Sequence, residues 1–389
     1  MSNGVMGTEQ RAEALVDLDA IRHNVALLVE RAARSGAETM IVVKADAYGH
    51  GALPVARAAV EAGASWLGTC SLAEALALRR AGITVRLLSW LDTPEVDFAP
   101  AVVADVDVGV SSLAELERVR QAAELVGASA RVHLKIDTGL WRNGCPAEQW
   151  PELVAAAAAT SDVEVVGVWS HLACADEPGD PSIDMQAERF ETAYQQAVQA
   201  GLSPIRHLAN SAATLTRPDL HLDLVRAGVA AYGLNPVVTG DDLRPAMTVR
   251  SQVVLTKRIP KGESVSYGHA WTADAERTLA LVPMGYADGV PRSLSGRMAV
   301  WLAGKRRPVV GRICMDQLVV DCGDDEPAVG AEVVLFGDGT HGGPTAREWA
   351  DAIGTIDYEI VTGMYAPRVH RDHLGVSGAA AAAGEPCDS

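Results

Sequence analysis

The sequence predicts a (β/α)8 barrel of the TIM type followed by a mostly β C-terminal domain, on three observations. As far as Asn235, short apolar strand-like segments alternate regularly with helical patterns. Beyond Pro236 the segments become shorter, β-rich and separated by turn residues. The apolar run 40–43 ends in Lys44, which is typical of a buried parallel strand that delivers a reactive side chain to the edge of a sheet.

The barrel prediction rests on a repeated strand-and-helix unit. Strand-like segments are expected at 40–44, 66–70, 85–90, 106–110, 130–136, 163–169, 205–209 and 222–226. Helical patterns lie between most of them, with apolar residues three and four apart, as at 72–80, 112–125 and 182–200. A doubly wound open sheet is the competing architecture. Ahead of the barrel we expect a strand at 14–18, and Asp19 as the N-cap of a helix through Glu30.

The C-terminal domain is expected to hold strands at 248–256, 278–282, 297–301, 309–313, 317–320 and 332–336, with one short helix at 345–353. We therefore predict a cofactor-binding barrel at 12–243 and a β-rich domain at 244–375, which the N-terminal segment could join. The boundary is expected between Pro236 and Pro245. The tail 376–389 has no periodic pattern to bury, so it is expected to be disordered.

Composition excludes several classes of partner. The 389 residues carry a net charge of −17, and phosphate backbones or anionic membranes would require a basic surface. No apolar stretch resembles a signal peptide or reaches the length of a membrane span. The six cysteines form no C-x-x-C pair, which argues against a zinc site or a disulfide framework and favours free thiols in the cytoplasm.

Reactive residue types follow several of the expected barrel strands, at the end where barrel enzymes place their chemistry. They are Lys44, Lys135 with Arg142, His171, Ser211 and Arg226. Partial desolvation at a strand end would make Lys44 a better nucleophile toward a carbonyl. Ser211 and the backbone N–H groups near Gly228 and Val229 suit a phosphate. A lysine beside a phosphate site suggests pyridoxal 5′-phosphate bound as a Schiff base.

Each of these residues also has a purely structural explanation. A lysine after a strand is most often a surface lysine, and His171 could be a hydrogen-bonded interior histidine. Arg226 could pair with Asp223, and Ser211 could cap the following helix. Convergence on one face of one barrel favours the functional interpretation.

The stretch VVKADAYGHG resembles the cofactor-binding signature of the alanine racemases, which are barrel-type pyridoxal phosphate enzymes. Further matching blocks follow in the same order across nearly all of residues 12–370: KIDTGLWRNG, SHLACADE, ANSAA, LVRAGVAAYGL, VSYGHAWTA, VPMGYADG, GRICMDQ and GTIDYEIVTGM. The resemblance implies an isomerase that interconverts L-alanine and D-alanine, a peptidoglycan precursor. It also implies a homodimer with shared active sites.

Position by position, the resemblance assigns most of the barrel residues to the cofactor. Lys44 resembles the lysine that binds it covalently, and Arg226 resembles the arginine that faces its pyridine nitrogen. Because a guanidinium keeps its proton, that nitrogen would stay unprotonated, which discourages transamination. The other residues that resemble cofactor contacts are Tyr48, Arg142, His171, Ser211, Gly228, Val229 and Tyr358. Lys135 resembles the lysine that this family often carbamylates and that orients Arg142.

The resemblance assigns most of the matching residues of the C-terminal domain to substrate binding, proton transfer and the access channel. Tyr267 resembles the base opposite Lys44, and Met315 resembles the residue whose backbone N–H binds the substrate carboxylate together with Arg142. The residues that resemble the lining of the access channel are Asp176, Tyr286, Arg292, Arg312 and Ile356. In the family, Tyr267, Tyr286 and Met315 reach the site of the partner subunit.

Racemisation would then use Lys44 for the D-isomer and Tyr267 for the L-isomer, with Arg142 or a charged His171 favouring the phenolate. The sequence departs from many relatives at Trp141, where a small residue is usual, and at Asp46, where Asn is common. Two alternatives are a barrel-type pyridoxal phosphate decarboxylase and a non-catalytic pyridoxal phosphate-binding protein. The VSYGHAW and CMD blocks argue against the first, and the β-rich domain argues against the second.

Overall fold

The computed structural model describes residues 10–364 and 367–376, which divide into two compact units. The barrel unit comprises Ile21–Ala47 and Ala52–Leu243. The β unit comprises the described residues of Met1–Ala20, Tyr48–Gly51 and Arg244–Ser389. The predicted disordered tail, 376–389, lies outside the described residues except for Val376.

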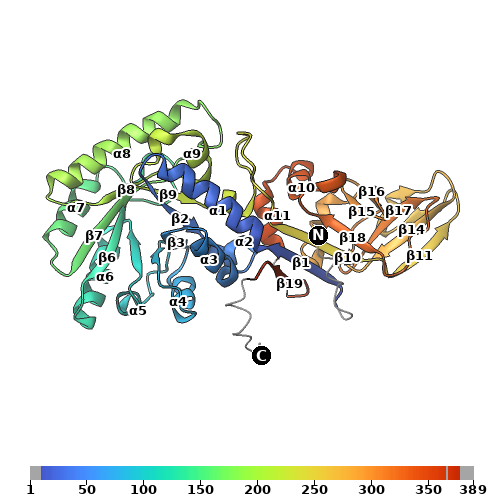
Figure 1. Cartoon of the computed structure of the whole chain (residues 1–389), viewed down its shortest axis with the longest axis horizontal. Helices are drawn as coiled ribbons and strands as arrows, with labels where there is room; N and C mark the ends of the chain where they lie inside the picture. The colour runs from blue at the N-terminus through green and yellow to red at the C-terminus, as the bar shows by residue number, and fades with distance from the viewer. Residues whose placement is uncertain (1–9, 365–366, 377–389) are drawn as a thin grey trace. The chain divides into compact units, whose positions relative to one another are not determined.

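The barrel unit contains an eight-stranded parallel sheet in the order β8-β7-β6-β5-β4-β3-β2-β9 (Figure 1). Its strands are β2 (Glu38–Val42), β3 (Trp66–Thr69), β4 (Arg86–Ser89), β5 (Asp107–Val110), β6 (Ala130–Lys135), β7 (Val163–Trp169), β8 (Ile205–His207) and β9 (Leu224–Ala227). The N–H groups of Asp223 and Arg226 donate to the carbonyls of Arg206 and Ala209 at 3.1 and 2.9 Å, which brings β9 against β8. The predicted barrel is confirmed, and the alternative of a doubly wound open sheet is wrong.

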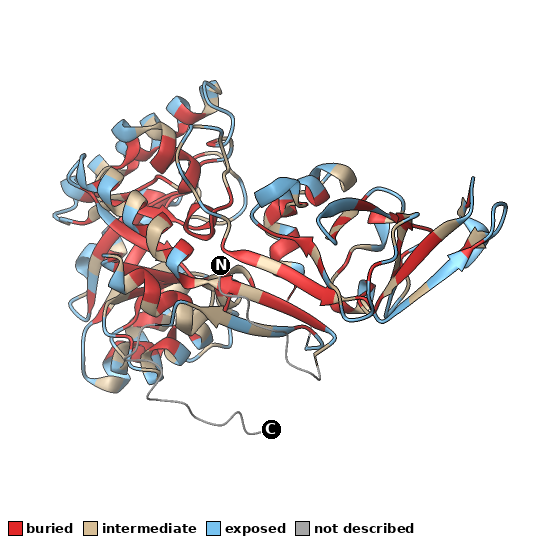
Figure 2. Ribbon diagram, turned by 45° about the vertical axis from the view of Figure 1, so that its right-hand side comes forward, coloured by how far each residue is buried: buried red, intermediate tan, exposed pale blue. Residues whose placement is uncertain are grey.

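Helices connect the barrel strands, and most of them present exposed residues outward, whereas α9 and the strands are largely buried (Figure 2). They are α1 (Leu18–Ala33), α2 (Lys44–Tyr48), α3 (Ala52–Glu61), α4 (Leu72–Arg80), α5 (Ala99–Val103), α6 (Leu113–Val126), α7 (Trp150–Ala159), α8 (Pro181–Gln199) and α9 (Ser211–Thr216), with the 3-10 turns η1 (Pro218–Leu220) and η2 (Val229–Tyr232). The expectation that Asp19 caps α1 is wrong. The carboxylate of Asp17 accepts the N–H groups of Asp19 and Ala20 at 2.8 and 3.1 Å, so the helix begins two residues earlier.

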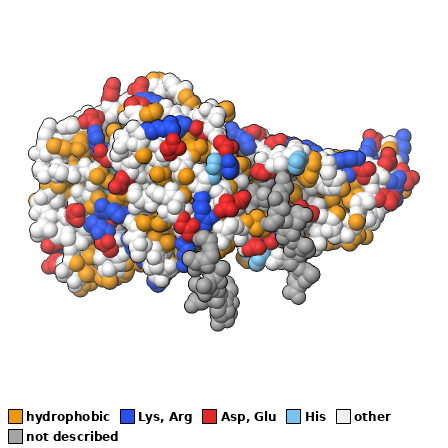
Figure 3. Space-filling view, in the orientation of Figure 1, with side chains coloured by type: hydrophobic (Ala, Val, Ile, Leu, Met, Phe, Trp, Pro, Cys, Tyr) orange, Lys and Arg blue, Asp and Glu red, His pale blue; other side chains and the backbone are white. Residues whose placement is uncertain are grey.

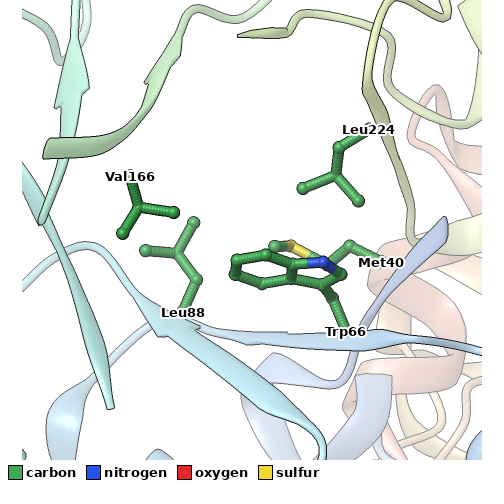
Figure 4. Packing of buried hydrophobic residues seen from close by; sticks show 5 residues of the cluster. All are labelled: Met40, Trp66, Leu88, Val166 and Leu224. Atoms are coloured by element: carbon green, nitrogen blue, oxygen red, sulfur yellow. The ribbon is translucent and has the colours of Figure 1, made fainter. Parts of the chain in front are cut away.

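The interior of the barrel combines large aromatic side chains with glycines. Figure 4 shows Met40 against the ring of Trp66, with Leu88, Val166 and Leu224 completing one apolar cluster. Glycines leave room for bulky neighbours. A Cβ at Gly167 would stand 2.3 Å from Nδ1 of His133, so that position accepts only glycine.

The β unit is built on a nine-stranded sheet in the order β11-β14-β17-β16-β15-β18-β10-β1-β19. Its strands are β1 (Ala12–Asp17), β10 (Met247–Gln252), β11 (Leu255–Ile259), β14 (Arg277–Val282), β15 (Ala299–Leu302), β16 (Lys305–Val310), β17 (Leu318–Gly323), β18 (Glu332–Phe336) and β19 (His370–Leu374). A separate hairpin pairs β12 (Ser264–Val265) with β13 (Trp271–Thr272). The helices are α10 (Ala346–Ile353) and α11 (Asp357–Gly363), with 3-10 turns η3 (Tyr267–His269), η4 (Tyr286–Asp288), η5 (Arg292–Leu294) and η6 (Thr340–Gly342).

Two expectations for this unit are wrong. The segment 248–256 is not one strand, because β10 pairs with β18 and β1 while β11 pairs with β14. Val253 and Val254, both apolar, lie at this change of partner, so periodicity alone cannot locate it. Helix α11 follows α10, so the described part of this unit has two helices, whereas only one was expected.

Candidate active site

Lys44 lies two residues after the end of β2 and is half-buried at the barrel end. The next four residues, Ala45 to Tyr48, all have φ between 51° and 54°, a left-handed turn that L-amino acids rarely form. Glu74 supports this turn, because its Oε1 accepts the N–H of Ala45 at 2.7 Å. Asp46 also suits it: Asp tolerates positive φ, and its Oδ1 accepts the N–H of Ala52, the first residue of α3, at 2.6 Å.

Ser211 and the loop after β9 form a donor-rich corner of the barrel. The Oγ of Ser211 accepts the N–H groups of Gly228 and Ala230 at 2.8 and 3.4 Å, and Val229 opens the turn η2. Ser211 is not the helix cap, because the side chain of Asn210 accepts the N–H of Ala213. The structure therefore joins the two loops in which barrels commonly bind phosphate.

Arg226 is buried on β9 and is held by backbone oxygens. Its Nη1 donates to the carbonyl of His207 at 2.6 Å, and its Nη2 donates to that of Ser170 at 2.7 Å. The alternative pairing with Asp223 is wrong, because Asp223 bonds Arg206. Burial lowers the pKa of Arg226 to about 9, so the guanidinium remains charged at neutral pH.

His171 and Lys135 lie in the same cationic environment. Nδ1 of His171 is 3.3 Å from Nη2 of Arg226. Burial, followed by the charges of Arg226, Arg142, Lys135 and Lys44, holds the pKa of His171 well below its ordinary value. The expectation that a charged His171 assists the tyrosine is therefore wrong, because the ring is neutral at neutral pH.

Burial and the charges of Arg226 and Arg142 also lower the pKa of Lys135 to about 7. The Nζ of Lys135 lies 4.3 Å from the ring centroid of Trp169. On the face shown in Figure 3, basic and acidic side chains are interspersed. At this end of the barrel, by contrast, four basic side chains lie together: Lys44, Lys135, Arg142 and Arg226. The barrel end is thus suited to an anion.

Sequence reasoning missed a buried polar chain that ends at Arg226. Asp107 Oδ2 lies 3.0 Å from Nε2 of His133, whose Nδ1 lies 2.8 Å from Nε2 of His207. Nδ1 of His207 in turn faces Nη1 of Arg226 at 3.4 Å. Asp107 accepts a hydrogen bond from Nε2–H of His133, so Nδ1 of His133 accepts from Nε2–H of His207. Nδ1 of His207 then presents its lone pair to Arg226. The alternation of polar residues on β6 was the available signal.

In the β unit, one loop gathers most of the predicted substrate residues. The backbone of residues 311–317 holds three neighbouring turns. Ser266 Oγ donates to the carbonyl of Arg312 at 2.7 Å, which fixes the turn of Tyr267. The N–H of Tyr286 donates to the carbonyl of Cys314 at 3.0 Å. The loop also carries Met315.

The turn of Arg292 is attached to the same loop through Ser295. The Oγ of Ser295 accepts the N–H of Ile313 at 3.0 Å and donates to the carbonyl of Arg292 at 2.7 Å. The side chains gathered here are open to solvent: Tyr267 is 70% exposed, Met315 52% and Tyr286 40%.

Tyr48 and Tyr358 belong to a second group in the β unit. A Cβ at Gly49 would stand 2.8 Å from the carbonyl oxygen of Val361, so the segment that carries Tyr48 packs closely on α11, the helix of Tyr358. Ile356 precedes α11 and is 54% exposed. In the barrel unit, Arg142 and Asp176 are exposed in the loops after β6 and β7, and Trp141 is 78% exposed.

Within residues 10–364 and 367–376, no group of three His, Cys, Asp or Glu side chains is arranged to hold a metal ion. None of the helices described is both long and apolar enough to cross a membrane.

Comparison with known proteins identifies the family of this chain. Residues 16–236 match the alanine racemase N-terminal domain, and residues 246–373 match the alanine racemase C-terminal domain. A curated alanine racemase of Salinispora tropica is 55% identical over 94% of this chain and 99% of its own length. The chain belongs to the alanine racemase family.

Solved structures support the same assignment. The alanine racemase of D-cycloserine-producing Streptomyces lavendulae has a TM-score of 0.92 and 51% identity, covering 95% of this chain and 98% of its own. That of Streptomyces coelicolor has a TM-score of 0.91 and 52% identity, covering 94% and 98%. The resemblance seen in the sequence is confirmed, and the protein is an isomerase of this family.

Proposed function

We propose that this racemase interconverts L-alanine and D-alanine with pyridoxal 5′-phosphate bound in the barrel unit. The observation that carries the proposal is the gathering of Lys44, Lys135, Arg142 and Arg226 beside the phosphate-type corner at Ser211, in a protein of net charge −17. A phosphorylated aldehyde requires both an amine and anion-binding donors, and this end of the barrel supplies both.

The residues present fit the cofactor at each of its polar groups. Lys44 supplies the amine, and Ser211 with the N–H groups near Gly228 and Val229 supplies the phosphate donors. Arg226 would face the pyridine nitrogen, and its carbonyl contacts keep it in place. The bound cofactor supplies an electron-withdrawing ring that acidifies the α proton of the amino acid.

Racemisation requires a base on each face of the substrate Cα. The Nζ of Lys44 takes and returns the α proton of D-alanine, and the Oη of Tyr267 takes and returns that of L-alanine. An ordinary phenol has a pKa of about 10, so a nearby cation must favour the phenolate. Arg142 is the cation for this role, because His171 is neutral. Arg142 and the backbone N–H of Met315 would bind the substrate carboxylate.

We further propose a homodimer in which the β unit of one subunit completes the site of its partner. The support is the exposed set Tyr267, Tyr286 and Met315, held together by the loop 311–317. Exposed aromatic and apolar side chains gathered in this way are typical of an interface. Asp176, Arg292, Arg312 and Ile356 would line the channel to the shared site.

The reaction is tested by incubating the holoenzyme with L-alanine in deuterated water, followed by chiral chromatography and mass spectrometry. Racemisation yields D-alanine that carries deuterium at Cα. Release of an amine would show a decarboxylase instead, and unchanged L-alanine would show a binding protein. Either result contradicts the proposal.

The shared site is tested by mixing two inactive variants, Lys44→Ala and Tyr267→Phe. Hybrid dimers contain one site with both Lys44 and Tyr267, so about a quarter of wild-type activity is expected after random subunit exchange. Verified exchange without any recovery would refute a site built from both subunits.

A further inference from the structure

Tyr267 lies between two residues with positive φ. Ser266 has φ 66° and ψ −176°, and Gly268 has φ 70° and ψ 14°. Glycine adopts such angles freely, but the conformation of Ser266 belongs to a region that is essentially confined to glycine. A serine at this position therefore requires a compensating interaction from its side chain.

The hydroxyl of Ser266 provides that interaction. Its Oγ donates to the carbonyl of Arg312 at 2.7 Å and lies 3.4 Å from Sγ of Cys314. A glycine would permit the same backbone angles but would lack the hydrogen bond to the carbonyl of Arg312. The side chain thus ties the turn of Tyr267 to the loop that also carries Met315.

Two glycines make this attachment possible. A Cβ at Gly311 would stand 2.8 Å from both the Cβ of Ser266 and the carbonyl oxygen of Val265. A Cβ at Gly268 would stand 3.1 Å from Nη1 of Arg312. The backbone on both sides of Tyr267 is therefore in close contact with the segment Gly311-Arg312.

We propose that Ser266 is a positioning residue for Tyr267, which holds the phenol at the substrate Cα by tying a glycine-like turn to the Arg312 carbonyl. The inference rests on the proposed role of Tyr267 as the base for L-alanine. A base on a short exposed turn has few contacts of its own, so the anchor next to it determines where its Oη lies. Displacement of a catalytic group by about 1 Å can cost about 100-fold in rate.

The test compares deuterium exchange at Cα of L-alanine and of D-alanine in three holoenzyme variants. Ser266→Ala retains the Cβ and loses the hydroxyl, so exchange into L-alanine should fall by about 100-fold, with the KM for L-alanine within about twofold. Exchange into D-alanine, which uses Lys44, should stay within about threefold. Ser266→Gly accepts the backbone angles but lacks the hydrogen bond to Arg312. Its rate of exchange into L-alanine should therefore fall less than that of Ser266→Ala, by about tenfold.

Ser264→Ala is the matched control. Ser264 lies two residues earlier, and its hydroxyl bonds that of Thr272 at 2.9 Å across the same hairpin. Both exchange rates should match the wild type in this control. The proposal would be overturned if Ser266→Ala lost exchange into L-alanine and into D-alanine equally, because a general structural defect lowers both rates. It would also be overturned if neither rate fell.

A double variant separates this inference from the proposed function. In a Tyr267→Phe background, adding Ser266→Ala should lower exchange into L-alanine no further, because Ser266 acts through the phenol. A further loss would show that Ser266 acts elsewhere. If Tyr267→Phe alone retained exchange into L-alanine, the proposed role of Tyr267 would fail first, whatever the serine variants showed.

Discussion

The buried histidine pair in the barrel predicts how the stability of this protein depends on pH. His207 and His133 are fully buried, and His207 also stacks on Trp169 with ring centroids 5.4 Å apart. Burial, followed by the charges of His133, Arg226 and Lys135, holds the pKa of His207 well below its ordinary value of 6.5. Around pH 5.5 His207 therefore binds less proton in the folded protein than in the unfolded chain.

The size of the effect follows from proton linkage. At pH 5.5 an unfolded histidine with a pKa of 6.5 is about 90% protonated, so unfolding takes up at most about 0.9 proton at His207. The stability contributed by the neutral ring is complete well above pH 6.5 and decreases as the pH falls through 6.5, by up to about 1.4 kcal/mol at pH 5.5. Burial also lowers the pKa of His133, which acts in the same direction.

Proton uptake can be measured directly by titrating native and guanidinium-unfolded protein at pH 5.5. His207→Gln keeps a side chain that donates and accepts, so proton uptake on unfolding should fall by up to about 0.9 proton relative to the wild type. Equal uptake by the wild type and His207→Gln would refute the assignment of a neutral buried ring.

The remaining predictions concern the cofactor and the Lys44 turn. Lys44→Ala should abolish both the absorbance of bound cofactor and racemisation, and survival of both would contradict its assignment. Arg226→Glu should increase transamination relative to racemisation, measured as pyruvate formed per turnover, because the ring nitrogen can then be protonated; an unchanged ratio would place that control elsewhere. If Lys135 is carbamylated through its neutral amine, the carbamate signal in 13C NMR with labelled bicarbonate should rise between pH 6 and 8, around its pKa of about 7, and be absent in Lys135→Met. Asp46→Ala should lower the free energy of unfolding by about 1 kcal/mol through loss of the α3 cap, with Asp46→Asn close to the wild type.

Local patterns were sufficient for most of the barrel. Each of the eight expected strands overlaps a strand of the structure, because a parallel strand buried on both faces must be apolar along its length. The errors arose where a segment alone is ambiguous. Asp17 and Asp19 are equally good caps by type, and the apolar run from β10 to β11 does not reveal where its partners change.

The candidate site divides in the same way. Lys44, Ser211 and Arg226 could be found from sequence because each lies in a barrel strand or within four residues of its end, and strand ends define one face. The polar alternation on β6 indicated His133 alone. Its contacts with Asp107 and His207 could not be found from sequence, because the three residues come from three strands and meet only inside the barrel. Their pKa values depend on that burial.

What the sequence determined by itself is the order of elements, the family and the residue types available for chemistry, since these follow from periodicity and from motifs of adjacent residues. Only the tertiary structure determined which charged side chains lie close together and how deeply they are buried. It made His171 neutral, gave Lys135 a pKa near neutrality and placed Ser266 in a backbone conformation suited to glycine. The physical reason is that desolvation, Coulomb interactions and backbone constraint depend on distances between residues that are far apart along the chain.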